Sequence, residues 1–144
     1  VYDDRDLAAF EGGAFLPFKA GIDAGADCVL VTHNIVPCVD GEAPASLSAA
    51  WHAVLRDTLG FAGVIITDDL SMGGVTDYTD GASAAVAAVL AGNDMLCCTD
   101  FETQIPAVLR AVEDGTISEA RIDESVLRIL RWKLERGIIA ARTE

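Results

Sequence analysis

The sequence predicts an α/β fold with a parallel sheet, and two observations lead to this prediction. Three apolar segments, residues 27–33, 63–69 and 93–100, lack the polar alternation of half-exposed strands, as strands buried on both faces do. Each segment ends in Thr followed by a polar residue, and these ends are 35 and 32 residues apart. That spacing accommodates one strand and one helix, and strand-helix units with short connections form parallel sheets.

Helical patterns fill the stretches before, between and after the strands. Pro17 stands where a first helical turn accepts proline, and Gly25 stands where a helix can end. A serine, Ser46 or Ser48, caps the next helix, which closes at Gly60. The predicted helices cover residues 15–25, 46–60, 80–92, 101–115 and 118–137. The last has an apolar stripe formed by Ile122, Val126, Ile129, Leu130 and Leu134.

The candidate catalytic and binding residues lie at the C-terminal ends of the strands. In parallel sheets, ligands bind at the C-terminal ends of the strands, and His33, Asp68 and Asp100 follow the three terminal threonines. Asp68 and Asp69 are consecutive on an extended chain, so their side chains diverge. One carboxylate therefore faces the mouth of the sheet, while the other can cap the loop that follows. On position alone, both could simply cap a strand end.

Composition narrows the class of protein. The formal net charge of −13 argues against binding nucleic acid or an anionic membrane surface. No apolar run reaches the roughly 18 residues of a membrane span, and the first residues carry neither the basic region nor the apolar core of a signal peptide. The cysteines form no C-x-x-C pair, which favours reduced core cysteines and is compatible with a cytoplasmic location. They are Cys28, Cys38, Cys97 and Cys98.

The segment "LRDTLGFAGVIITDDLSM", residues 55–72, resembles the nucleophile region of family 3 glycoside hydrolases, in their bacterial β-N-acetylhexosaminidase branch. Its flanks, "LPFKAGIDAGADCVLVTH", "PASLS" and "RIDESVLRILRWKLERG", resemble that family in the same order. The resemblance covers nearly all of the chain. It implies one partial domain over residues 1–144, the C-terminal portion of a (β/α)8 TIM-type barrel with three strands plus outer helices, and no second domain.

The resemblance also implies roles for individual residues. Asp68 matches the family nucleophile, which forms a covalent glycosyl-enzyme that water then hydrolyses with net retention. His33 and Met72 match positions beside the sugar, and we expect them to bind substrate. His52 is expected to be solvated on its helix. The implied substrate is terminal β-linked N-acetylglucosamine, for example from cell-wall fragments, and the reaction needs no metal and no cofactor.

One family feature is missing from these 144 residues. The general acid/base in that branch is a His after a Lys-His-Phe-Pro-Gly-His-Gly motif, which does not occur here. We therefore expect this chain alone to be inactive. Three strands of an open barrel leave an apolar inner face, expected to include Val29, Val31, Val64 and Ile66. The expected partners are the missing N-terminal part of the barrel or a second copy of the chain, giving a dimer or larger assembly, in addition to the carbohydrate.

Three other functions remain open on the sequence. One is a β-glucosidase of the same family. Another is an α/β enzyme that binds Mg²⁺ through Asp68, Asp69 and Asp100, because three acidic strand ends meet at one edge. The third is a non-catalytic module that docks onto another chain through its open sheet.

Overall fold

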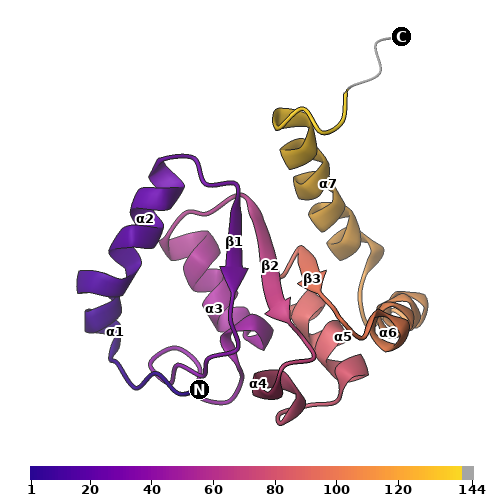
Figure 1. The fold of residues 1–144 in the computed structure, drawn as a ribbon, viewed down its shortest axis with the longest axis horizontal. Coiled ribbons are helices and arrows are strands. Elements are labelled where there is room, and N and C mark those ends of the chain that lie inside the picture. Colours follow the sequence, from indigo (N-terminus) through magenta and orange to yellow (C-terminus); the bar gives the residue numbers. More distant parts are fainter. Residues whose placement is uncertain (141–144) are drawn as a thin grey trace.

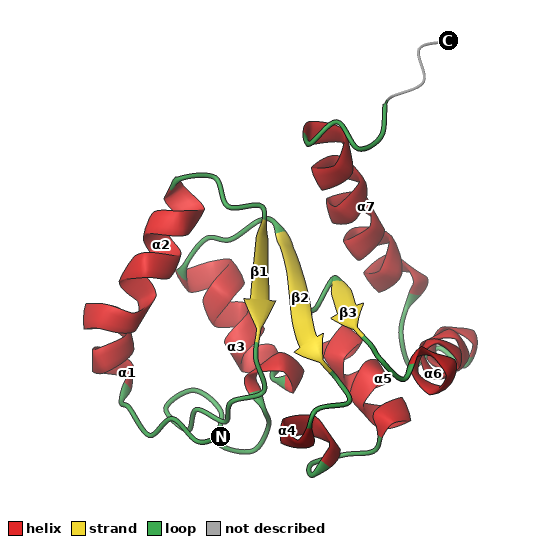
Figure 2. Ribbon diagram, in the orientation of Figure 1, coloured by secondary structure: helices red, strands yellow, loops and turns green. Residues whose placement is uncertain are grey.

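A computed structural model describes residues 1–140 of the protein (Figures 1 and 2). Three strands form one parallel sheet in the order β1-β2-β3: β1 (Cys28–Val31), β2 (Val64–Asp69) and β3 (Met95–Cys97). In Figure 1, α3 and α5 lie behind this sheet. The predicted α/β class and the three parallel strands are confirmed.

Helices connect the strands where the sequence predicts them. The α-helices are α1 (Leu7–Ala9), α2 (Phe15–Asp23), α3 (Ala49–Ala53), α4 (Gly73–Thr76), α5 (Gly81–Ala91), α6 (Phe101–Glu113) and α7 (Glu119–Glu135). Short π- and 3-10 turns extend them: η1 (Phe10–Ala14), η2 (Ala45–Leu47) and η3 (Val54–Thr58). The turn η3 continues α3, so together they form the helix predicted after β1.

Caps explain where these helices start and stop. The Ser48 hydroxyl accepts the Trp51 N–H at the start of α3, and the Ser118 hydroxyl accepts the Arg121 N–H at the start of α7. Each bond satisfies one of the amide groups that a first helical turn leaves unpaired. After α2 the chain reaches Gly25, whose φ is +87°. Residues other than glycine rarely adopt this left-handed backbone conformation, so glycine favours the end of the helix here.

The pairing register decides which strand side chains face the helices. Val29 pairs with Ile65, and Leu30 pairs with Ile66. Val29 and Val31 pack with Ile65 against η3 and α2, so the expectation that these two valines lie on the open inner face is wrong. Leu30, which is 51% exposed, takes that place beside Ile66. The error arose because register cannot be counted from the strand sequences alone.

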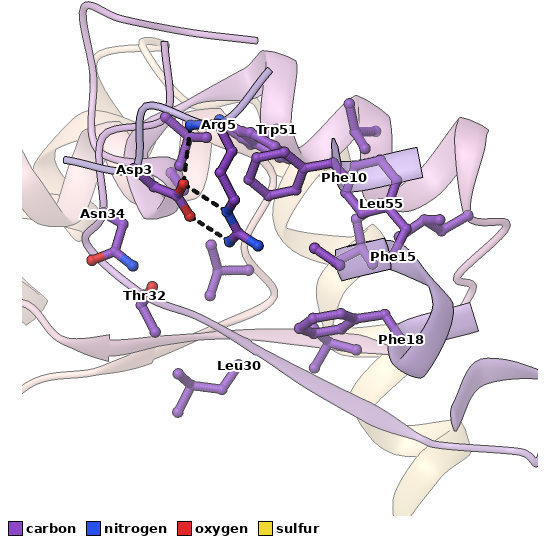
Figure 3. Close-up of a pocket in the computed structure, with 17 residues that line it drawn as sticks. Asp3, Arg5, Phe10, Phe15, Phe18, Leu30, Thr32, Asn34, Trp51 and Leu55 are labelled. Atoms are coloured by element: carbon purple, nitrogen blue, oxygen red, sulfur yellow. Dashed lines mark hydrogen bonds and ion pairs between the residues drawn. The ribbon is translucent and has the colours of Figure 1, made fainter. Parts of the chain in front are cut away.

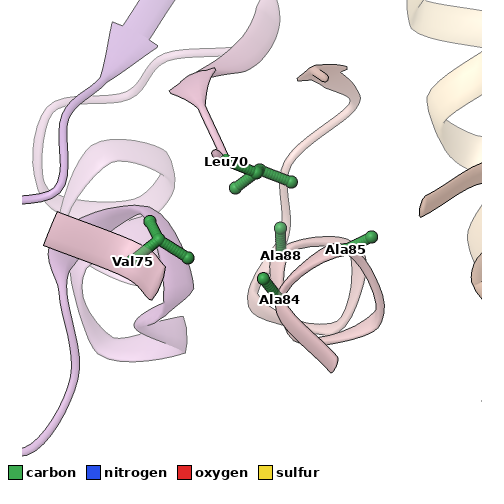
Figure 4. Packing of buried hydrophobic residues seen from close by; sticks show 5 residues of the cluster. All are labelled: Leu70, Val75, Ala84, Ala85 and Ala88. Carbon is green, nitrogen blue, oxygen red and sulfur yellow. The ribbon is translucent and has the colours of Figure 1, made fainter. Parts of the chain in front are cut away.

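A small-residue core joins α5 to the end of β2. Leu70 and Val75 pack against Ala84, Ala85 and Ala88, and all five are fully buried (Figure 4). The small alanine side chains let the backbone of α5 approach the end of β2 closely, so this part of the core is well packed and excludes water.

An ionic cluster binds α7 to the N-terminal end of the sheet. Asp94 precedes β3 and has a fully buried side chain. Its carboxylate accepts from Arg56 Nη2 at 2.7 Å, Arg128 Nη1 at 2.9 Å, Ser125 Oγ at 2.8 Å and the Ile65 N–H at 3.0 Å. One carboxylate thus connects η3, β2 and α7.

Two expectations about single side chains are wrong. His52 is buried rather than solvated, because α3 packs against the end of α5: its Nδ1 lies 2.7 Å from the Ser48 carbonyl oxygen, and its ring lies against Gly92. The four cysteines are free, but the core position expected for them is wrong: Cys97 is exposed, and Cys28, Cys38 and Cys98 are only partly buried. Within residues 1–140, no helix has the length and hydropathy to cross a bilayer.

Candidate active site

Asp69, at the end of β2, is bound inside the turn that follows the strand. Its carboxylate accepts the Ser71 N–H at 2.8 Å, the Thr99 N–H at 3.4 Å and the Thr99 hydroxyl. The Thr99 hydroxyl bond, followed by the Ser71 N–H, lowers the pKa of Asp69 below its ordinary value. The carboxylate of Asp69 therefore ties the end of β2 to the chain that leaves β3.

The main chain of Asp69 is bound as well. Its carbonyl oxygen accepts the Met72 N–H at 3.1 Å and lies 2.9 Å from His33 Nε2. Its N–H donates to Asp68 Oδ1 at 2.9 Å. Every polar group of Asp69 thus has a partner within the protein.

Asp68 accepts fewer hydrogen bonds than Asp69 does. The Asp69 N–H is its one hydrogen-bond partner in the described part of the chain, and it forms no ion pair there. The side chain is half-buried and alternates with Thr67 and Asp69, which places it on the face of Ile66, opposite the face that packs against η3. A carboxylate with one oxygen oriented and the other unbound suits attack on an electrophilic carbon.

His33 is buried below the C-terminal ends of the strands rather than exposed there. The residue is 6% exposed, its Nδ1 lies 2.7 Å from Ser46 Oγ, and its Nε2 faces the Asp69 carbonyl oxygen. Neither ring nitrogen is available to a ligand unless one of these bonds breaks. Met72, in contrast, is 47% exposed at the start of α4, where it can contact a ligand at the edge.

Two residues of this arrangement were not singled out from the sequence. Thr99 belongs to the third Thr-polar strand ending, and that pattern was the available signal for it. Ser46 was considered only as a helix cap, and nothing in its surroundings indicated that it would bond His33 across 13 residues.

Metal ligands do not gather at this edge. Within residues 1–140, no three His, Cys, Asp or Glu side chains lie close enough together to hold an ion. Asp69 is also occupied by Thr99 and Ser71. The arrangement therefore does not favour the Mg²⁺ alternative.

A cavity of about 250 Å³ lies at the free edge of β1 (Figure 3). Aromatic and aliphatic side chains dominate its wall, and Arg5, paired with Asp3, lies 4.6 Å from the centroid of the Phe10 ring. Phe18 and Trp51 are also part of the wall. Neither Asp68 nor Asp69 lines this cavity, so it is separate from the candidate chemistry.

Comparison with known proteins gives a consistent result. Residues 1–132 match the family model described as the glycosyl hydrolase family 3 N terminal domain. A β-hexosaminidase of Chromobacterium violaceum is 37% identical over 111 residues, which cover 76% of this chain and 31% of that protein. A β-hexosaminidase of Methylococcus capsulatus is 30% identical over 143 residues, 99% of this chain and 42% of that protein.

Among solved structures, a family 3 β-N-acetylglucosaminidase from Paenibacillus sp. str. FPU-7 superposes with a TM-score of 0.91 at 34% identity. The match covers 99% of this chain and 28% of that one. The chain thus spans less than half the length of each of these three proteins.

Proposed function

The chain belongs to glycosyl hydrolase family 3, and from this membership we propose that it supplies the nucleophile, Asp68, of a retaining glycosidase. One observation carries the choice of residue. Of the two adjacent carboxylates, Asp69 is fully occupied by the turn, whereas Asp68 keeps one oxygen that has no hydrogen-bond partner within residues 1–140. The attacking oxygen of a nucleophile has to be free to reach the substrate. The carboxylate oxygens of Asp69 are instead held by hydrogen bonds within the turn.

In the proposed reaction, an oxygen of Asp68 attacks the anomeric carbon of the terminal sugar as the bond to the leaving group breaks. An acid protonates the departing oxygen, and the sugar remains attached to Asp68 as an ester. Water, deprotonated by the same group, then displaces Asp68 with net retention. The family's acid/base motif does not occur in these 144 residues, so this group has to come from a part of the enzyme outside them.

The proposed substrate is a terminal β-linked N-acetylglucosamine. The names of the matched relatives, two β-hexosaminidases and a β-N-acetylglucosaminidase, support it. A β-glucosidase of the same family is the alternative, and the ratio of kcat/KM values for the nitrophenyl N-acetylglucosaminide and the nitrophenyl glucoside separates the two.

Substitution in the intact enzyme tests the nucleophile. Asp68→Ala should abolish turnover, whereas Asp69→Ala should leave measurable activity, because it loosens the turn without removing the attacking group. A 2-fluoro sugar inactivator should modify Asp68, and fragmentation of the labelled peptide can distinguish the two neighbours. A label on Asp69 or Asp100 would refute the assignment.

A further inference from the structure

We infer that His33 is a positioning residue that orients Asp68 through the backbone of Asp69, an inference that rests on the proposed function. The connection consists of two hydrogen bonds, joined by the main chain of Asp69. His33 Nε2 donates to the Asp69 carbonyl oxygen at 2.9 Å, which holds the main chain of Asp69 in place. The N–H of that residue donates to Asp68 Oδ1 at 2.9 Å, which fixes the direction of the candidate nucleophile.

The partners of the imidazole determine its tautomer. A carbonyl oxygen only accepts hydrogen bonds, so Nε2 carries the proton. Nδ1 of the neutral ring is then an acceptor and receives the hydroxyl proton of Ser46, at 2.7 Å. This arrangement gives the ring one orientation.

Ser46, the partner of the ring at Nδ1, is itself held in place. Ser46 is fully buried, and its carbonyl oxygen accepts from Asn93 Nδ2 at 2.7 Å. Asn93 is itself buried, at the end of α5. A continuous buried chain of hydrogen bonds therefore runs from α5 through Ser46 and His33 to the end of β2, and its buried members cannot exchange these bonds for water without cost.

Packing closes the remaining side of His33. A Cβ on Gly74, in α4, would lie 3.0 Å from His33 Cβ and 3.4 Å from its carbonyl oxygen. Glycine at this position lets α4 press against His33, which leaves the imidazole little room to turn toward the edge of the sheet. These contacts fit a supporting role for the ring better than a role in binding sugar.

Two amide variants separate the bonds of the imidazole. The amide nitrogen of Gln can reach the place of Nε2, whereas the amide of Asn reaches only the place of Nδ1. In the intact enzyme, His33→Gln should keep kcat within a few-fold of the native value. His33→Asn, which loses the bond to Asp69, should lower kcat on the order of 10²-fold with little change in KM, because misplacing a reacting group by about 1 Å has such an effect.

The controls separate this inference from the proposed function. If Asp68→Ala leaves activity intact, the proposed function fails. If Asp68→Ala is inactive but His33→Asn turns over as fast as His33→Gln, only the positioning role fails. A rise in KM at unchanged kcat in both His33 variants would indicate sugar contact and overturn the inference. Independently of activity and of variant folding, ¹⁵N NMR of native His33 should show the proton on Nε2, and a proton on Nδ1 alone would overturn it.

Discussion

Asp94→Ala is expected to be the most destabilising single substitution at the N-terminal end of the sheet. The carboxylate is fully buried and accepts four hydrogen bonds, two of them from Arg56 and Arg128. These two arginine side chains are only 19% and 23% exposed, so water cannot fully replace the lost partner. Burial lowers the pKa of Arg56, and the charge of Asp94 opposes that shift.

The size of the effect follows from this burial. Removing one partner of a buried ion pair typically costs about 3–5 kcal/mol, because the other charge is left desolvated. With an m-value of about 2 kcal/mol/M in urea, the midpoint of unfolding should fall by about 1.5–2.5 M.

Urea unfolding followed by circular dichroism, at one fixed protein concentration, measures this shift. Asp123→Ala is the matched control, because Asp123 is exposed on α7 and the substitution removes the same charge. The control should stay within about 0.5 kcal/mol of the native chain. An Asp94→Ala midpoint equal to that of Asp123→Ala would refute the conclusion that the Asp94 cluster attaches α7 to the sheet.

Three further outcomes are expected. The isolated 144-residue chain should hydrolyse nitrophenyl N-acetylglucosaminide no faster than its Asp68→Ala variant, because the family's acid/base motif does not occur in it and such a group contributes roughly 10²- to 10⁴-fold to the rate. Clear Asp68-dependent turnover would contradict this. Among the described residues, the outer edge of β1 has no neighbouring strand, and Leu30 and Phe18 are half exposed, so sedimentation at several concentrations should show a dimer or larger assembly rather than a compact monomer. Because the Thr99 hydroxyl lowers the pKa of Asp69, the stability that Asp69 contributes should be complete well above its ordinary value of 3.8 and disappear as the pH falls through the lowered pKa. The difference in Tm between the native chain and Asp69→Ala should therefore shrink below about pH 4, and a difference that grows on acidification would show the opposite sign.

The sequence alone determined the elements and the order in which they occur. Strand and helix patterns depend on side-chain periodicity within a few residues, and caps such as Ser48 and stops such as Gly25 act within one turn. The strand endings were read in the same way, which is why Asp68 and Asp69 could be recognised as a pair at the C-terminal edge. The family resemblance then proposed Asp68 as the nucleophile.

Only the tertiary structure decided how each polar side chain is used. His33 reaches Asp69 across 36 residues, and Arg56 reaches Asp94 across 38, so no local pattern could show either contact. The same holds for His52, which is buried because α3 packs on α5. The face of Val29 likewise depends on the register between β1 and β2. Periodicity specifies which residues become buried strands, but the partner of a buried polar group depends on which segments the fold brings together.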